Sequence, residues 1–223
     1  MSDADATEAL PIFPLSNVVL FPRVKTPLHL FEPRYRQLAR DVIEGNRRFA
    51  MMVVRPEHVD DMPGNPPIFP VGCVGTVTEH QRLPDGRYNL VLEGDHRVRV
   101  VGETPPDDQR LYRLADVRRL EDPYPDDARE RVSHLREAIL LDIQFVVAQS
   151  QPGRSFDASQ FQGVDDETFV NVFANAFAFP AEEKQGLLEA DSIPDRFARL
   201  ASALSMQRFE VERGSKGGRS TLH

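Results

Sequence analysis

Residues 10–36 constrain the fold more than any other stretch, because prolines punctuate two short apolar runs there. The runs cover residues 10–15 and 26–30. Proline has no amide hydrogen to give to a strand ladder, so within sheets it is confined to strand starts, edges and bulges. The pattern therefore predicts two short, bent strands near sheet edges, as in a small barrel.

An amphipathic helix is predicted directly after the second of these strands. Pro33 suits the first helical position, and Glu32 precedes it at the positive end of the helix dipole. Gly45 is a typical helix stop. The apolar residues between them recur at helical spacing: Tyr35, Leu38, Ala39, Val42 and Ile43. The segment thus predicts the order strand, loop, strand, helix.

The next 75 or so residues predict the remaining strands of a small, mostly antiparallel barrel. Residues 48–54 form a nearly continuous apolar run, typical of a buried strand. A glycine-rich strand over residues 71–78 leads into a hairpin, because the sequence LPDGR at residues 83–87 has the proline and glycine of a tight turn. Gly94 and Asp95 predict a second tight turn, and residues 97–100 and 111–120 predict two further strands.

A change of composition marks a predicted domain boundary at residues 121–127, which read EDPYPDD. Four helices are predicted beyond it: one over residues 128–149, one from Asp165, one from Pro180 and one capped by Asp191 or Ser192. Residues 138–148 of the first helix are apolar on nearly all sides, so we expect them at the centre of a helical bundle. The predicted organisation is a barrel subdomain at residues 9–120, a helical subdomain at 126–213, and disordered tails at 1–8 and 214–223.

Composition narrows the classes of function. The net charge is −8 and the arginines are interleaved with acids, which argues against a nucleic-acid partner. No apolar run is long enough to span a bilayer, so we expect no membrane partner and a cytoplasmic location. The single cysteine, Cys73, excludes an internal disulfide and a cysteine-rich zinc site, and its apolar surroundings indicate a buried, inert thiol.

The sequence predicts no catalytic, metal-binding or cofactor-binding residues. His29 and Glu32 are the most tempting acid–base pair, but a structural role for His29 in the barrel wall is the simpler interpretation. Serine occurs in no GxSxG context. Four aspartate doublets lie where aspartate is common as a turn or cap residue: 60–61, 107–108, 126–127 and 165–166.

The strings LPIFPL, LFP and PLHLFEPRYR closely resemble the N-terminal substrate-binding domain of Lon proteases. The chain looks most like the free-standing version found in bacteria without the ATPase and protease domains. Arg23 departs from the pattern, since a glycine is expected after Leu20, Phe21 and Pro22. The resemblance implies an α+β fold, with a PUA-like pseudo-barrel followed by helices. It also implies non-catalytic recognition of unfolded or apolar polypeptide segments, or of a protease or chaperone partner.

Three phenylalanines next to prolines are the candidate peptide-binding residues: Phe21, Phe31 and Phe69. Prolines hold irregular backbone open, so these side chains could line a groove at the barrel rim. The alternative is that all three are core residues, above all Phe31, which lies where the first helix packs. Two other classes of function stay open: an RNA-binding PUA-like protein, and a small hydrolase in which His29 and Glu32 converge. No particular oligomeric state is predicted.

Overall fold

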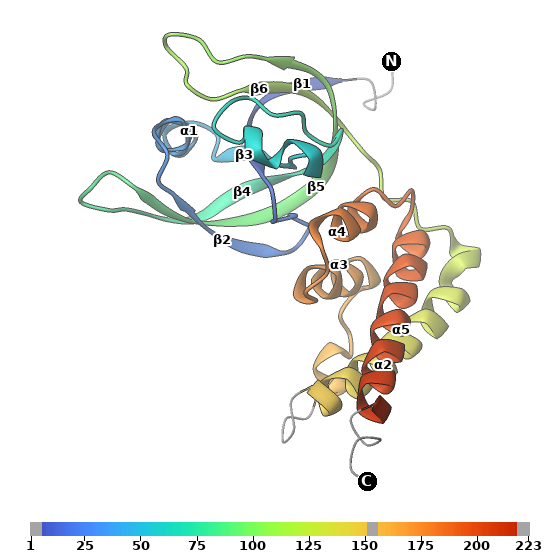
Figure 1. Cartoon of the computed structure of the whole chain (residues 1–223). Coiled ribbons are helices and arrows are strands. Elements are labelled where there is room, and N and C mark those ends of the chain that lie inside the picture. Colours follow the sequence, from blue (N-terminus) through green and yellow to red (C-terminus); the bar gives the residue numbers. More distant parts are fainter. Residues whose placement is uncertain (1–5, 151–155, 218–223) are drawn as a thin grey trace. The chain divides into compact units, whose positions relative to one another are not determined.

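The structure is a computed structural model that describes residues 6–150 and 156–217 (Figure 1). The predicted α+β class is confirmed, since a six-stranded sheet is combined with helices. The contacts group the chain into two compact units. The first contains the chain up to Glu121 together with Asn171–Glu189, and the second contains Asp122–Val170 and the chain from Ala190.

The sheet of the first unit curls into a closed barrel. Its strands are β1 (Thr7–Leu15), β2 (Lys25–Leu30), β3 (Arg48–Val53), β4 (Val71–Arg82), β5 (Tyr88–Thr104) and β6 (Leu114–Arg119). Their order is β2-β5-β4-β3-β1-β6, and a pairing of β5 with β6 closes the ring. Only the β1–β3 pair is parallel among these pairings. Strand β4 pairs with one side of β5. On the other side of β5, β2 pairs with the first half of β5 and β6 pairs with its second half.

Local sequence signals place most of these elements correctly. Helix α1 (Pro33–Glu44) begins at the predicted proline and buries Tyr35, while Gly45 follows its last residue. Strand β3 covers the apolar run at residues 48–53. The β4–β5 hairpin turns where LPDGR predicted it, with Gly86 at a φ of 82° that favours glycine. Figure 1 shows this hairpin extending outward from the barrel.

Arg23 occupies the position where the family resemblance led us to expect glycine, and it has a φ of 65°. This left-handed conformation is sterically costly for a residue with a Cβ atom. The backbone there is held by a bond from the Arg23 N–H to the Gly94 carbonyl oxygen, at 2.8 Å. The turn that glycine would adopt is therefore retained with an arginine in it.

The predicted turn at Gly94 and Asp95 is wrong, because β5 continues through both residues as one 17-residue strand. The pairing with β4 shifts register there, between Val74 and Gly75. A Cβ atom on Gly94 would overlap the Phe21 carbonyl oxygen. Glycine is present so that two backbone segments can approach closely, which is its other common role in strands.

Strand β1 begins at Thr7, so Thr7 and Glu8 pair with β6, although the prediction placed both in a disordered tail at residues 1–8. Residues 1–5 of that predicted tail lie outside the described residues. At the other end, helix α5 (Ile193–Gly217) extends past residue 213. The predicted division into a barrel subdomain at 9–120 and a helical subdomain at 126–213 stays a prediction.

Residues 171–189 belong to the first unit and bond to its barrel. They include the second half of α3 (Asp166–Ala176) and all of α4 (Ala181–Leu188). The buried Asn171 amide donates to the Pro22 carbonyl at 3.1 Å, and the buried Gln185 amide donates to that of Val71 at 2.9 Å. Arg97 in turn donates to the Leu188 carbonyl at 2.8 Å. These bonds satisfy polar groups that burial would otherwise leave costly.

The second unit is organised around α2 (Arg129–Ser150), which packs against α5. In this unit the buried Arg196 of α5 forms an ion pair with Asp122, with 2.6 Å between the nitrogen and the oxygen. The prediction that α2 is buried on all sides in its second half is wrong, since Leu141 is 61% exposed and Ala138, Gln144 and Ala148 are exposed as well. None of the helices in residues 6–150 and 156–217 combines the length and hydrophobicity that crossing a membrane requires.

Candidate functional site

The candidate site lies at strand β2, which has one sheet neighbour, β5, among the described strands. Side chains alternate along it: Thr26, Leu28 and Leu30 are buried, and the residues between them are exposed. This is the two-residue period expected of a half-buried strand. Pro27 is in the middle of this edge, where a missing amide hydrogen costs no ladder bond.

A groove with a volume of about 390 Å³ runs beside this edge, over β2, β4 and β5. Its apolar lining residues are Pro27, Leu28, Leu90 and Val91, and its polar lining residues are His29, Glu79, His80, Gln81 and Asn89. Leu28 and Leu90 pair across the two strands. The groove thus combines apolar and polar groups across β2, β5 and β4, a form suited to an extended chain.

His29 is fixed by its neighbours on β5 and the hairpin turn. Its Nδ1 lies 2.7 Å from the Asn89 Oδ1, and its Nε2 lies 3.3 Å from a terminal nitrogen of Arg87. The tautomer with its proton on Nδ1 satisfies both bonds, since Nδ1–H then donates to Asn89 and Nε2 accepts from Arg87. Arg87 is also paired with Asp85 at 2.7 Å, and hydrogen bonds from Arg87 hold the pKa of Asp85 below its usual value.

Phe31 continues the alternating pattern of β2 and is 59% exposed. Its ring stacks on that of His29, with 6.1 Å between the centroids. The expectation of an exposed Phe31 therefore agrees with the structure, and the core alternative for it does not. The two-residue alternation of β2, extended by one residue to Phe31, is the sequence signal that distinguishes an exposed Phe31 from a core Phe31.

The other two candidate phenylalanines differ from Phe31. Phe21 is fully buried, so its assignment to an exposed rim is wrong: the segment of residues 21–23 lies against β5, which turns this side chain into the core. Phe69 is half-buried, and the Arg55 guanidinium lies 5.5 Å from the centre of its ring. Of the three, only Phe31 has a largely exposed ring, which lies on His29 of the groove.

The geometry does not support the hydrolase alternative. Glu32 accepts a hydrogen bond from the Arg34 Nε at 2.9 Å, whereas His29 bonds to Asn89 and Arg87, so the two side chains have different partners. Cys73 is buried, as expected of a structural thiol. Within the described ranges, no three His, Cys, Asp or Glu side chains gather as a metal site.

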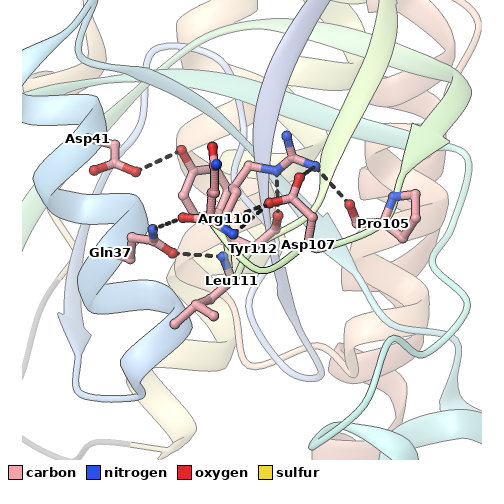
Figure 2. Close-up of polar contacts among 8 residues, drawn as sticks. Gln37, Asp41, Pro105, Asp107, Arg110, Leu111 and Tyr112 are labelled. Carbon is pink, nitrogen blue, oxygen red and sulfur yellow. Dashed lines mark hydrogen bonds and ion pairs between the residues drawn. The ribbon is translucent and has the colours of Figure 1, made fainter.

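Hydrogen bonds join the β5–β6 loop to side chains of α1, as Figure 2 shows. The Gln37 side chain donates to the Gln109 carbonyl at 2.6 Å and accepts from the Leu111 N–H at 2.7 Å. The Tyr112 hydroxyl donates to Asp41 at 3.1 Å. Burial and the negative charge of Asp41 raise the pKa of Tyr112 to about 12. These hydrogen bonds hold α1 in place, and with it the short connection between β2 and α1.

Asp107 organises the same loop from within. Its carboxylate accepts the backbone N–H groups of Gln109 and Arg110, at 2.9 and 2.8 Å, and these bonds lower its pKa. Asp165 likewise accepts the Thr168 N–H at 2.9 Å at the start of α3. Both aspartates thus have the turn and cap roles that their sequence contexts indicate.

A curled α+β barrel with an open strand edge and an apolar groove is the architecture of a binding domain. The family model described as the ATP-dependent protease La (LON) substrate-binding domain matches residues 9–205, so the chain belongs to this family. Sequence relatives include Lon protease 2 of Desulfotalea psychrophila, 26% identical over 93% of this chain, and Lon protease of Solibacter usitatus, 27% identical over 95%. The chain spans about a quarter of the length of these relatives, 26% of each.

Two solved structures share the fold. The Lon N-terminal domain protein from Xanthomonas campestris aligns with a TM-score of 0.59 and 21% identity, over 87% of this chain and 98% of that one. The N-terminal domain of the Mycobacterium avium complex Lon protease aligns with a TM-score of 0.66 and 13% identity, over 89% and 98%. At these identities the likeness concerns the fold.

Proposed function

We propose that this chain is a non-catalytic, cytoplasmic module that binds unfolded or apolar polypeptide segments. The observation that carries the proposal is the match to the Lon substrate-binding family over residues 9–205. The groove over β2, β5 and β4 supports it, because an extended peptide could lie in the groove and contact its apolar lining residues.

Phe31 is the residue that we assign to the contact. A phenylalanine side chain that passes from water into an apolar contact contributes about 1.5–3 kcal/mol. Its exposure of 59% leaves more than half of that surface available to a ligand. Because association itself costs several kcal/mol, a few such contacts give weak, reversible binding. That affinity suits a module that samples many unfolded clients.

The test is a fluorescence polarisation titration with a labelled, uncharged apolar peptide. Phe31→Ala should weaken binding by about 1–2 kcal/mol, or about five- to thirtyfold in Kd, because part of the contact is lost. Val101→Ala is the matched control, since Val101 is 53% exposed and lies in the half of β5 that pairs with β6. Far-UV circular dichroism should show both variants folded.

Equal binding by the two variants would show that Phe31 is not in the contact, and no binding by the wild type would refute the proposed function. The non-catalytic part of the proposal has its own assay. The purified chain should hydrolyse neither ATP nor casein, and turnover that persists through a second purification would contradict it.

A further inference from the structure

A second pocket lies between α1 and the turn of the β4–β5 hairpin. Its volume is about 320 Å³, and three of its lining side chains are arginines: Arg36, Arg40 and Arg82. None of its lining residues is acidic. In a chain with a net charge of −8, this local excess of positive charge is the opposite of the average surface and would attract anions.

Arg36 is held in place by the hairpin turn. Its Nε donates to the Gly86 carbonyl at 2.8 Å, and a Cβ atom on Gly86 would overlap its guanidinium group. This is the hydrogen bond that the Arg36 side chain makes within the described part of the chain, so its two terminal nitrogens keep their donors for a ligand, while Asp85 offsets part of its charge. A guanidinium that is already oriented loses less entropy when it binds.

The other two arginines differ in how far their charge is compensated. Arg40 is paired with Asp41 at 2.9 Å, and Asp41 also accepts from Tyr112. Arg82 is exposed and makes no hydrogen bond or ion pair with any residue in 6–150 or 156–217 that could neutralise it. Arginine donates two parallel hydrogen bonds to a carboxylate, and such charge-assisted bonds are stronger than neutral ones.

We propose that this basic pocket binds carboxylates of an acidic polypeptide segment, an inference that rests on the proposed function. Arg82 and Tyr88, which pair across β4 and β5, line the pocket, whereas their neighbours Gln81 and Asn89 line the groove, so the two sites lie on opposite faces of the hairpin. A peptide whose apolar part lies in the groove can therefore place a flanking carboxylate among the arginines only by passing around the end of the hairpin. A nucleic acid fits less well, because its repeated phosphates require a longer basic track than one pocket offers.

The experiment compares three labelled peptides with the same apolar sequence. One is uncharged and amidated, one carries two aspartates at one end and is amidated, and one is uncharged with a free C-terminal carboxylate. At low salt we expect the aspartate peptide to bind about two- to fivefold more tightly than the uncharged one, the range for one partly exposed ion pair. The advantage should shrink as salt is added. An equal gain for the third peptide would make a terminal carboxylate an equivalent ligand.

Arg82→Gln should abolish this advantage, and Arg99→Gln should preserve it. Arg99 is the matched control, because it is an exposed arginine in the part of β5 that pairs with β6, where it lies opposite Arg118. Equal binding of all three peptides to the wild type would overturn the inference and leave the proposed function intact. If only the aspartate peptide binds, and only with Arg82 present, the pocket is supported and apolar recognition fails. A short RNA that displaces this peptide at equal concentration would make phosphate the ligand and overturn the inference.

Discussion

Gly94 is the position at which one added methyl group should do most damage to the barrel. In Gly94→Ala the new Cβ atom would overlap the Phe21 carbonyl oxygen and lie 2.8 Å from the Phe21 carbonyl carbon. Both are backbone atoms, so no side-chain rotation can make room. The segment of residues 21–24 would have to move away from β5.

That movement would break the two bonds that join the segments. The Arg23 N–H donates to the Gly94 carbonyl at 2.8 Å, and the Gly94 N–H donates to the Val24 carbonyl at 2.9 Å. Each bond contributes about 1 kcal/mol net, and overpacking in a dense region costs about 1–3 kcal/mol more. We therefore expect Gly94→Ala to lower the free energy of unfolding by about 3–5 kcal/mol.

Urea denaturation followed by far-UV circular dichroism measures this change. Gly186→Ala is the control, because a Cβ atom there meets no other atom within 4 Å and α4 should gain about 0.5–1 kcal/mol from replacing a helical glycine. The reasoning fails if Gly94→Ala unfolds at the same urea concentration as the wild type. It also fails if both glycine variants lose stability equally, since the effect would then not depend on the close approach.

Two further predictions concern backbone strain and alkaline stability. Arg23→Gly should raise the free energy of unfolding by about 0.5–1 kcal/mol, because glycine adopts a φ of 65° without the Cβ penalty, whereas Arg23→Ala keeps the penalty and should give no gain in the same urea assay. For Tyr112, the raised pKa means that the folded state holds its proton longer than the unfolded state, so its stabilisation is complete below pH 10 and is lost as the pH rises towards 12. Tyr112→Phe should lose about 1 kcal/mol at pH 7 but show a flatter decline in stability between pH 9 and 11.5, and an unchanged decline would contradict this assignment.

Elements that depend on neighbouring residues in the sequence could be predicted, because their signals are local. The start of α1 at Pro33 and the hairpin turn at residues 83–87 follow from proline and glycine backbone preferences. The turn predicted at Gly94 failed because the reason for that glycine is Phe21, more than 70 residues away in the sequence. The exposure of Leu141 was missed because an apolar stretch does not reveal how many of its sides find a partner.

The candidate site divides in the same way. The exposure of Phe31 follows from the two-residue period of β2, which the sequence contains, while the burial of Phe21 depends on packing against β5. Arg36 and Arg40 are four residues apart and so share a helix face, which is a visible signal. Arg82 joins them only because the hairpin folds back against α1.

The pairing of β1 with β6 has a consequence for how this protein emerges from the ribosome. Thr7 pairs with Arg118, and ribosomes add about 5–20 residues per second, so β1 waits roughly 5–20 s for the strand that closes the barrel. Folding is slowed by such distant partners, because loop closure precedes any stabilising contact. During that interval the strand partner of Thr7 and Glu8 is absent, so the nascent chain exposes an apolar segment of the kind that we propose the folded domain binds.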